Sequence, residues 1–270
     1  MRESSVAESM PPYSKSNVDR LGERLRSDAV SDDDLLLLDT HRRSFQTSYE
    51  LVITTVRHQL GLQPTGRPAK STSAIREKLR RESIRLSQMQ DIAGCRVVVA
   101  DTFEQADVVE KLQVIFPECS VVDRRKKASH GYRAVHVIVK HAEQSIEIQV
   151  RTKLQHTWAE LSEKAADVID AAIKYGGGSE RDRKLLQATS DAIAAHEEAV
   201  ALLAEFEGQV SQILDDPEFE NGAAAKGVTV EQLRQSVANL RAATIATQTT
   251  IENVLADATR KFSQAEREER

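Results

Sequence analysis

The fold is decided by the stretch that reads YRAVHVIVKHAEQSIEIQVR from residue 132 to residue 151. Two segments rich in β-branched residues, 132–140 and 145–151, flank a short polar turn, and this pattern predicts a β-hairpin. In the second segment every other side chain is apolar, which predicts that Glu147, Gln149 and Arg151 share one face of the strand. Because a half-exposed strand shows the same alternation, the pattern predicts a strand and leaves the purpose of its polar face open.

The segments before the hairpin complete a sheet. The run CRVVV at residues 95–99 is short and β-branched, which predicts a buried strand. Residues 103–116 have the period of a helix, and residues 120–122 predict a further strand. This order of elements predicts an α/β (α+β) fold, in which a mixed β-sheet forms the core and helices flank it.

Helices are predicted before and after these strands in the sequence. Ser31 and Asp34 resemble a capping box, which opens a helix that runs to about residue 58. Thr229 and Gln232 form a second such pair, which opens a final helix to about residue 262. The predicted parts are a flexible tail over residues 1–30, a core domain over residues 31–175 and a helical extension over residues 176–270.

Composition limits the class of protein. The 270 residues carry a net charge of -5, and no apolar stretch is long enough to cross a membrane. The two cysteines, Cys95 and Cys119, lie in apolar runs and are expected to be buried free thiols. These features favour a cytoplasmic protein without a membrane partner.

The charges are distributed unevenly along the chain. Residues 67–96 contain eight Lys or Arg against three acidic residues, and residues 124–127 read RRKK. Between Lys184 and Lys226 the chain has acidic residues and no Lys or Arg. This asymmetry indicates an anionic ligand near the middle of the chain, although a charge run is more often a solvated face.

Two carboxylates are candidates for a metal site. Asp91 precedes the first strand, where Gly94 permits a close approach of another backbone, and Glu147 lies in the hairpin. Carboxylates at the ends of neighbouring strands can hold Mg²⁺ and leave room for substrate phosphates. His and Cys residues do not have the spacing of a transition-metal site, so Mg²⁺ is the expected cofactor.

Two groups of basic residues are candidates for binding the phosphates of the substrate. Arg67, Lys70 and Lys78 flank a predicted helix start, where backbone N–H groups also favour anions. A second group is formed by Lys126, Lys127 and the block GYRAVH at residues 131–136. In that block Tyr132 offers a flat face for stacking a base, and Arg133 and His136 can donate hydrogen bonds. A core tyrosine and an ordinary strand histidine are the alternative interpretations.

Four sequence blocks together resemble the RelA/SpoT synthetase domain. Their order and spacing match that family over residues 66–164. The resemblance implies a nucleotidyltransferase-like sheet and transfer of pyrophosphate from ATP to a nucleotide 3′-hydroxyl. The blocks are Gly66-Arg67 with Lys70, Ser73 and Lys78; Asp91-Ile92-Ala93-Gly94-Cys95-Arg96; the GYRAVH block; and Glu147-Ile148-Gln149-Val150-Arg151-Thr152 with Trp158.

The resemblance also implies roles for single residues. Asp91 holds Mg²⁺, and Glu147 assists the metal and takes the proton of the 3′-hydroxyl, with His136 at the reacting centre or the acceptor phosphates. The residues implied on the ATP side are Arg67, Lys70, Ser73, Lys78, Arg96 and Arg151. Those implied on the acceptor side are Lys126, Lys127, Tyr132, Arg133 and Gln149.

The chain departs from the family pattern at several positions. Arg67 and Lys70 are one residue farther apart than is common, Glu163 replaces a frequent His, and Ala134 replaces a frequent Ser. With Ala134, the block starting at Gly131 is similar to that of toxic small members of the family, some of which make adenosine alarmones or modify the tRNA 3′-CCA end.

The first interpretation is a (p)ppGpp synthetase that uses ATP and GTP or GDP. The second is a toxin with a tRNA acceptor and an antitoxin partner, and the third is an inactive nucleotide-binding regulator. The acidic extension is not expected to bind nucleic acid. Its two long helices are expected to pair antiparallel and to pack on the core or on a second subunit, or to receive the antitoxin.

Overall fold

The computed structural model describes residues 14–214 and 229–268. The expected tail before residue 14 and the acidic loop after residue 214 lie outside these residues. The chain divides into two compact units, and each is described by itself. The first unit is Met1–Val97, Val109–Val122 and His136–Val150, and the second is Val98–Val108, Asp123–Val135 and Arg151–Arg270.

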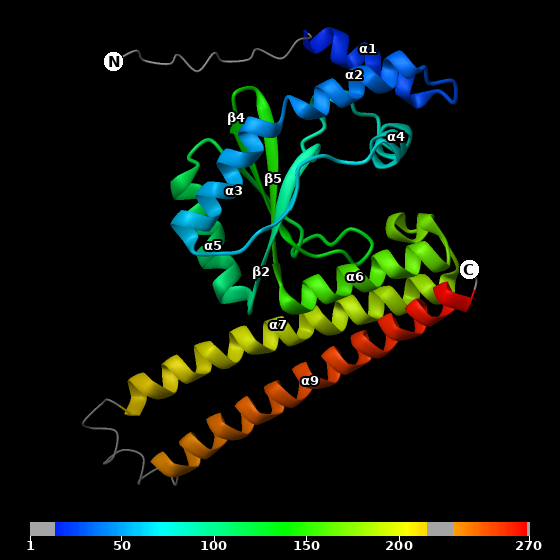
Figure 1. Cartoon of the computed structure of the whole chain (residues 1–270). Coiled ribbons are helices and arrows are strands. Elements are labelled where there is room, and N and C mark those ends of the chain that lie inside the picture. The colour runs from blue at the N-terminus through cyan, green and yellow to red at the C-terminus, as the bar shows by residue number, and fades with distance from the viewer. Residues whose placement is uncertain (1–13, 215–228, 269–270) are drawn as a thin grey trace, which may run out of the picture. The chain divides into compact units, whose positions relative to one another are not determined.

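A five-stranded sheet is the centre of the fold, and the sequence predicted four of its strands (Figure 1). β1, which was not predicted, pairs antiparallel with β2, so that Gly66 lies opposite Cys95. The crossover helix α5 (Thr102–Ile115) follows β2 and leads to β3. Across the sheet the order is β1 (Thr65–Arg67), β2 (Ala93–Val99), β5 (Gln144–Thr152), β4 (Val135–His141) and β3 (Ser120–Asp123).

The predicted hairpin is formed by β4 and β5. Its turn residues Ala142 and Glu143 have φ of 45° and 68°, the left-handed conformation that tight hairpin turns require. Ile146 and Ile148 are fully buried, and Glu147 on the opposite face is only 9% exposed. β5 is therefore buried on both faces, which excludes the half-exposed strand.

The first helix lies in the segment that was predicted to be a flexible tail. Residues 15–26 form α1 (Lys15–Arg26), whose apolar side chains Val18, Leu21 and Leu25 are buried. Their spacing of three and four residues places them on one face of the helix. The prediction of a flexible segment was wrong here, because this short stripe lies among many polar residues.

The helix predicted from Ser31 to about residue 58 is two helices, α2 (Asp32–Arg43) and α3 (Gln46–Leu60). The predicted helix start is confirmed as a single N-cap bond and not as a reciprocal capping box, since the Ser31 side chain accepts a hydrogen bond from the backbone N–H of Asp34 at 3.2 Å. The break falls at Ser44, whose hydroxyl donates to the carbonyl oxygen of His41 at 2.7 Å. Such local bonds compete with a continuous helix.

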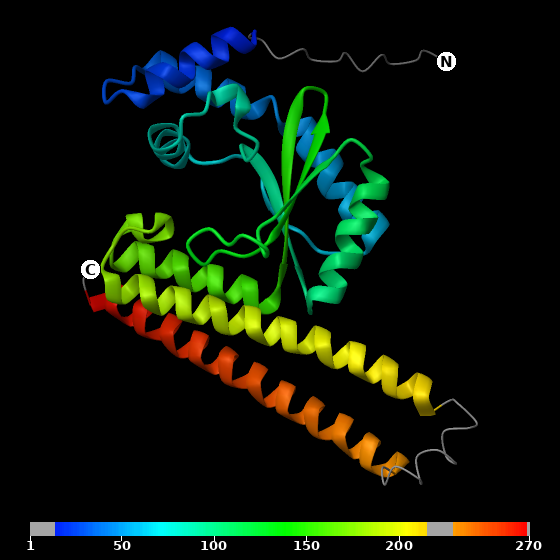
Figure 2. The same ribbon diagram turned by 180° about the vertical axis from the view of Figure 1, so that it is seen from behind.

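Helix α3 runs along one side of the sheet (Figures 1 and 2). Ser48 on α3 is buried and lies 2.9 Å from Nδ1 of His141 at the end of β4. Tyr49 packs so closely on Gly66 of β1 that any side chain at position 66 would meet the tyrosine hydroxyl.

Helix α4 (Thr72–Arg81) begins at Ser71, which caps it by accepting from the N–H of Ala74 at 3.3 Å. Two cations on α4 bind the free carbonyls at the end of α1. Arg76 donates to the carbonyl oxygen of Leu25 at 3.1 Å, and Arg80 to that of Arg26 at 2.9 Å. Cations stabilise helix C-termini in this way, so part of the basic segment serves the fold instead of a ligand.

The second unit contains the predicted helical extension. Helix α6 (Lys153–Val168) and the short helix η2 (Ala171–Tyr175) precede α7 (Glu180–Leu214) and α9 (Val230–Glu268). Figures 1 and 2 show α6, α7 and α9 side by side, with α7 and α9 antiparallel as expected. They enclose an apolar cluster that includes Trp158 and Leu255.

Two smaller predictions have different outcomes. Both cysteines are free thiols, but only Cys95 is buried, because Cys119 lies in a turn outside the strand. Over the parts of the chain that the structure describes, the helices are too short or too polar to cross a membrane.

Candidate active site

The two candidate carboxylates lie on neighbouring strands of the first unit. Asp91 comes two residues before β2, and Glu147 lies in β5, which pairs with β2. A Cβ atom placed on Gly94 would approach the backbone oxygen of Glu147 so closely that something must shift. The expected close approach at Gly94 is therefore present, and it brings the start of β2 against Glu147.

Asp91 is held by two lysines. Its carboxylate accepts from Nζ of Lys70 at 2.6 Å and from Nζ of Lys78 at 3.0 Å. Arg67 donates to the backbone oxygen of Asp91 at 3.2 Å. Burial raises the pKa of Asp91, but the charges of Lys70 and Lys78 outweigh it and lower the pKa to about 2. Asp91 is therefore an anion at neutral pH, surrounded by three of the predicted phosphate-binding residues.

Glu147 is held by residues of the same hairpin. One oxygen lies 2.9 Å from Nδ1 of His136, and the other accepts from Nε2 of Gln149 at 2.6 Å. Burial raises the pKa of Glu147, but the hydrogen bond and charge of His136 outweigh burial and the charge of Asp91, so the net shift is downward. Burial, together with the charge of Glu147, raises the pKa of the Cys95 thiol to about 12, which makes it a poor nucleophile.

The structure thus brings together most of the residues predicted for catalysis and ATP binding. Ser73 is exposed in the first turn of α4. Arg96 lies on β2 opposite Thr65 of β1. Neither their contact with ATP nor that of Gln149 with an acceptor is visible in a structure without ligands, and these roles stay predictions.

The donor set fits a magnesium ion. Among the described residues, no group of three or more His, Cys, Asp or Glu is arranged to hold a metal. Mg²⁺, however, is commonly bound by one or two carboxylates, and substrate phosphates and water complete its shell. Asp91 and Glu147 are close enough for the charge of Asp91 to raise the pKa of Glu147. A site of two carboxylates completed by substrate is therefore compatible with this unit.

Four of the predicted acceptor residues, Lys126, Lys127, Tyr132 and Arg133, belong to a loop of the second unit, residues 124–134, which we call the acceptor loop, whereas Gln149 lies on β5. Lys126 and Lys127 are exposed on the loop. The Tyr132 hydroxyl accepts from Arg151 at 2.9 Å, and the Arg151 guanidinium lies 4.9 Å from the centre of the Tyr132 ring. Arg151 therefore supports the predicted stacking residue, and its role towards ATP stays a prediction.

Sequence reasoning missed the polar side chains that anchor the acceptor loop. Arg125 binds the carboxylate of Asp123 through two nitrogens, at 3.0 and 2.8 Å, and donates to Oε1 of Gln105 at 3.2 Å. Gln105 donates in turn to Gln155 on α6 at 2.9 Å. Gln105 and Gln155 are almost fully buried. They are 50 positions apart, so only the fold could reveal the pair.

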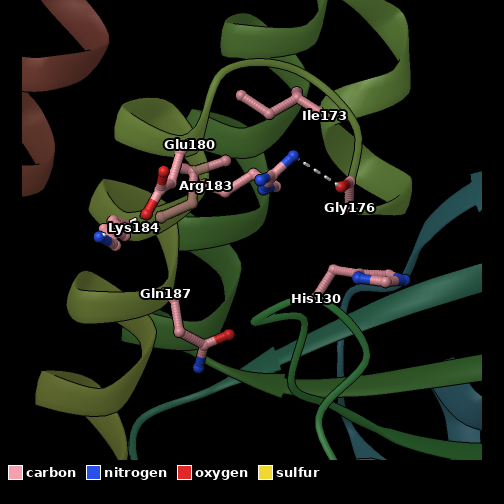
Figure 3. Close-up of a pocket in the computed structure, with 8 residues that line it drawn as sticks. His130, Ile173, Gly176, Glu180, Arg183, Lys184 and Gln187 are labelled. Atoms are coloured by element: carbon pink, nitrogen blue, oxygen red, sulfur yellow. Dashed lines mark hydrogen bonds and ion pairs between the residues drawn. The ribbon is translucent and has the colours of Figure 1, made fainter.

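A pocket of about 320 Å³ lies beside the acceptor loop in the second unit (Figure 3). His130 of the loop lines it, together with residues of η2 and the first turns of α7. Its charged groups are used within the protein: Arg183 donates to the carbonyl oxygen of Gly178 at 3.0 Å, and Lys184 pairs with Glu180 at 2.6 Å. The charged groups of this pocket therefore do not indicate a ligand, and the pocket borders the acceptor loop.

Gly94→Ala is expected to destabilise the protein by about 1–3 kcal/mol, the usual range for overpacking. The new methyl group would press on the backbone of Glu147, which cannot move as a flexible side chain could. Urea denaturation gives the free energy of unfolding. Gly208→Ala in α7 is the matched control, because a Cβ there meets no atom within 4 Å, and it should be neutral or stabilising. An unchanged urea midpoint for Gly94→Ala would contradict the close approach.

Comparison with known proteins gives relatives from two mycobacteria. Uncharacterised proteins of Mycobacterium tuberculosis and Mycobacterium bovis are each 32% identical to the chain over 188 residues, which is 62% of this chain. The match spans 64% of the length of these curated relatives.

Two solved structures have a similar backbone. The small alarmone synthetase 1 from Bacillus subtilis is 26% identical with a TM-score of 0.46, and the match covers 63% of this chain and 97% of that one. A GTP pyrophosphokinase family protein from Streptococcus pneumoniae is 24% identical with a TM-score of 0.45, and the match covers 70% of this chain and 100% of that one.

The family match falls on the segment that carries the candidate site. Residues 66–171 match the family described as the region found in RelA / SpoT proteins. This segment contains Lys70, Asp91, Tyr132 and Glu147, and it agrees with the resemblance seen in the sequence. Over residues 66–171 this chain is therefore similar to the region found in RelA and SpoT proteins.

Proposed function

We propose that this protein is an ATP-dependent pyrophosphotransferase that transfers the pyrophosphoryl group of ATP to the 3′-hydroxyl of GDP or GTP, forming (p)ppGpp. The observation that carries the proposal is the pair formed by the half-buried carboxylate of Asp91, just before β2, and the buried carboxylate of Glu147 on β5, within the segment similar to RelA and SpoT proteins. Asp91 is paired with Lys70 and Lys78, which are expected to bind phosphate, and Glu147 is held by His136 and Gln149.

The donor side rests on Lys70 and Lys78. In the absence of nucleotide both lysines neutralise Asp91, and they are 12% and 22% exposed at their side chains. When the phosphates of ATP arrive, the same cations can bind phosphate oxygens. Asp91 and Glu147 would hold Mg²⁺, which supplies charge neutralisation to the transferring group.

The reaction needs a base for the acceptor hydroxyl. Glu147 is expected to take the proton as the 3′-oxygen bonds to the β-phosphorus of ATP. The bond from that phosphorus to the α–β bridging oxygen breaks, and AMP leaves with the bond electrons. Because the pKa of Glu147 is lowered, it is a carboxylate at neutral pH and has an oxygen ready for that proton.

The acceptor side rests on the acceptor loop. Tyr132 is half-buried and fixed by Arg151, so its ring has a defined orientation for stacking on a base. Lys126 and Lys127 are exposed on the same loop and can contact acceptor phosphates.

The experiment that tests the proposal supplies γ-labelled ATP together with GDP, GTP, ADP or bulk tRNA. Label in a guanosine product supports it. Label in an adenosine product or on tRNA would show that the acceptor is not a guanine nucleotide. The proposed transfer of pyrophosphate from ATP would still hold. Absence of label from all four acceptors would leave only a nucleotide-binding protein and contradict the proposal.

A tRNA acceptor is the second candidate function. It is favoured by the exposed cations Lys126 and Lys127 and by Ala134 in the GYRAVH block. Binding to a polyanion falls steeply with salt because counterions are released. Transfer to tRNA should therefore decline much more strongly between 50 and 200 mM salt, by about 10³-fold or more for six phosphate contacts, than transfer to a mononucleotide.

Tyr132→Ala is expected to raise the acceptor KM by about tenfold or more, because stacking of a base on an aromatic ring contributes about 1–3 kcal/mol. The KM for ATP should stay unchanged. Initial rates measured with one substrate varied at a time separate the two values. Tyr132→Phe is the matched control, since it keeps the ring beside Arg151 and removes the hydroxyl that accepts from Arg151. A change confined to the KM for ATP would place Tyr132 on the donor side.

A further inference from the structure

The hydroxyl of Ser190 links the acceptor loop to helix α7 through two hydrogen bonds. Ser190 of α7 is 1% exposed. Its Oγ donates to the carbonyl oxygen of Gly131 at 2.6 Å and accepts from Nε of Arg133 at 3.1 Å. Gly131 and Arg133 are the two chain neighbours of Tyr132. The hydroxyl of Ser190 therefore holds the backbone before Tyr132 and the side chain after it.

The loop conformation requires such a restraint. His130 and Gly131 have φ of 51° and 86°, both in the left-handed region. This region is unfavourable for a residue with a side chain, such as His130. Two consecutive left-handed residues form a sharp turn directly before Tyr132. Backbone hydrogen bonds between Ser129 and Tyr132, at 2.9 and 3.3 Å, close this turn, and contacts with helix α7 hold the closed turn in place.

Helix α7 also supports the ring that lies under the turn. Trp158 packs on Gly131 so closely that a Cβ there would lie 2.6 Å from Cζ2 of the indole. The indole N–H donates to the carbonyl oxygen of Leu186 on α7 at 3.0 Å. One turn of α7 thus contacts the loop directly through Ser190 and indirectly through Trp158.

The side chain of Arg133 makes further contacts with the acceptor loop and with helix α7. Besides its bond to Ser190, it donates to the carbonyl oxygen of Arg125 at 2.7 Å and lies 3.7 Å from the carboxylate of Asp191. Arg125 stands at the start of the loop, so Arg133 closes the loop on itself. Ser190 then fixes this closed loop to the helix.

We propose that Ser190 is a positioning residue for the acceptor, and that α7 of the C-terminal extension is thereby part of the acceptor-binding apparatus. The inference rests on the proposed function, because it assigns to Ser190 the task of holding Tyr132 in the conformation that stacks on the acceptor base. Ser190 sets the fraction of protein molecules in which the acceptor loop has the conformation that binds the acceptor. It does not act on the transfer step at the carboxylates.

Ser190→Ala tests the proposal, since alanine removes both hydrogen bonds and favours the helix. Loss of a buried partner shifts the loop away from its competent conformation, and the acceptor KM rises by the same factor as that population falls. We expect the acceptor KM to rise about five- to tenfold, while kcat and the KM for ATP stay within about twofold.

A binding measurement without turnover gives an independent readout. Trp158 is the one tryptophan in the sequence, and it packs on the acceptor loop. Its fluorescence should report binding of GDP in the absence of ATP. The Kd for GDP should rise in Ser190→Ala by the same factor as the acceptor KM. Ser211→Ala, at an exposed position of the same helix, is the matched control and should change neither value.

Each outcome of these measurements decides the matter. An unchanged acceptor KM and GDP Kd in a folded Ser190→Ala protein would overturn the proposal. A lower melting temperature with equal losses for ATP and acceptor would reduce Ser190 to a structural residue, and would also overturn it. Failure of the proposed function is distinguishable, because it would appear in the parent chain as absence of transfer and of GDP binding.

Discussion

Glu147→Gln is expected to lower the rate of pyrophosphate transfer by on the order of 10²–10⁴-fold, with further loss through the metal. Glutamine keeps the shape of the side chain and removes the charge. It cannot take the proton of the 3′-hydroxyl, and its amide is a weak ligand for Mg²⁺. The fold should be retained, since Gln149 and His136 can rearrange their hydrogen bonds around a neutral group of the same size.

The measurement is the initial rate with γ-labelled ATP and the acceptor that the labelling experiment identifies, at saturating Mg²⁺. Glu143→Gln is the matched control, because Glu143 is exposed in the turn of the same hairpin. It should transfer at the parent rate. Transfer by Glu147→Gln within a few-fold of the parent would remove Glu147 from the reaction and leave Asp91 as the sole candidate carboxylate of the site.

The sheet was predictable because its signals are local. The two segments of the hairpin have a period of two, and the turn between them is short and polar, so neighbouring residues determine the structure. The start of α2 was predictable for the same reason, since Ser31 caps the helix only three positions away. Failures occurred where a local signal was weak: α1 has a short apolar stripe, and the break at Ser44 depends on one side-chain bond.

The candidate site was predicted by residue type but not by its internal contacts. The sequence indicated that Asp91 binds a metal and that Lys70 and Lys78 bind phosphate. It could not show that both lysines neutralise this same carboxylate, because they are 21 and 13 positions away from it. The bond of Ser190 to Gly131 spans 59 positions, and the sequence predicted the helix that carries Ser190 but not its contact with the loop.

The charge distribution had two causes that the sequence could not separate. Of the basic residues between positions 67 and 96, Lys70 and Lys78 lie at Asp91, and Arg76 and Arg80 bind the end of α1. Lysines at a carboxylate and arginines at helix carbonyls look alike in a composition count. Only the fold distinguishes cations available to a phosphate from cations used in packing.

Asp91→Asn is expected to lower transfer by about a hundredfold or more and to raise the Mg²⁺ concentration for half-maximal activity by at least about tenfold. Replacing even a residue that only orients a metal ligand costs 10–100-fold in affinity or activity, and a ligand should cost no less. The pKa of Asp91 is about 2, so the parent supplies a full negative charge at every pH used for assay. The amide supplies none.

The same substitution has a second effect, on the lysines. Lys70 and Lys78 lose their anionic partner, and their charges then repel one another across the site. They should bind ATP phosphates without first leaving a carboxylate, so the KM for ATP should stay the same or fall while the Mg²⁺ requirement rises. Opposite shifts of these two quantities distinguish a lost metal ligand from a general loss of structure, which would worsen both.

Titration of activity with Mg²⁺ at saturating ATP measures the first effect, and titration with ATP at saturating Mg²⁺ measures the second. Asp167→Asn is the matched control, because Asp167 is exposed on α6 and the same charge is removed away from the carboxylates. If Asp91→Asn has the Mg²⁺ dependence of the parent, Asp91 is not a metal ligand. Its task is then to hold Lys70 and Lys78 in place for the phosphates.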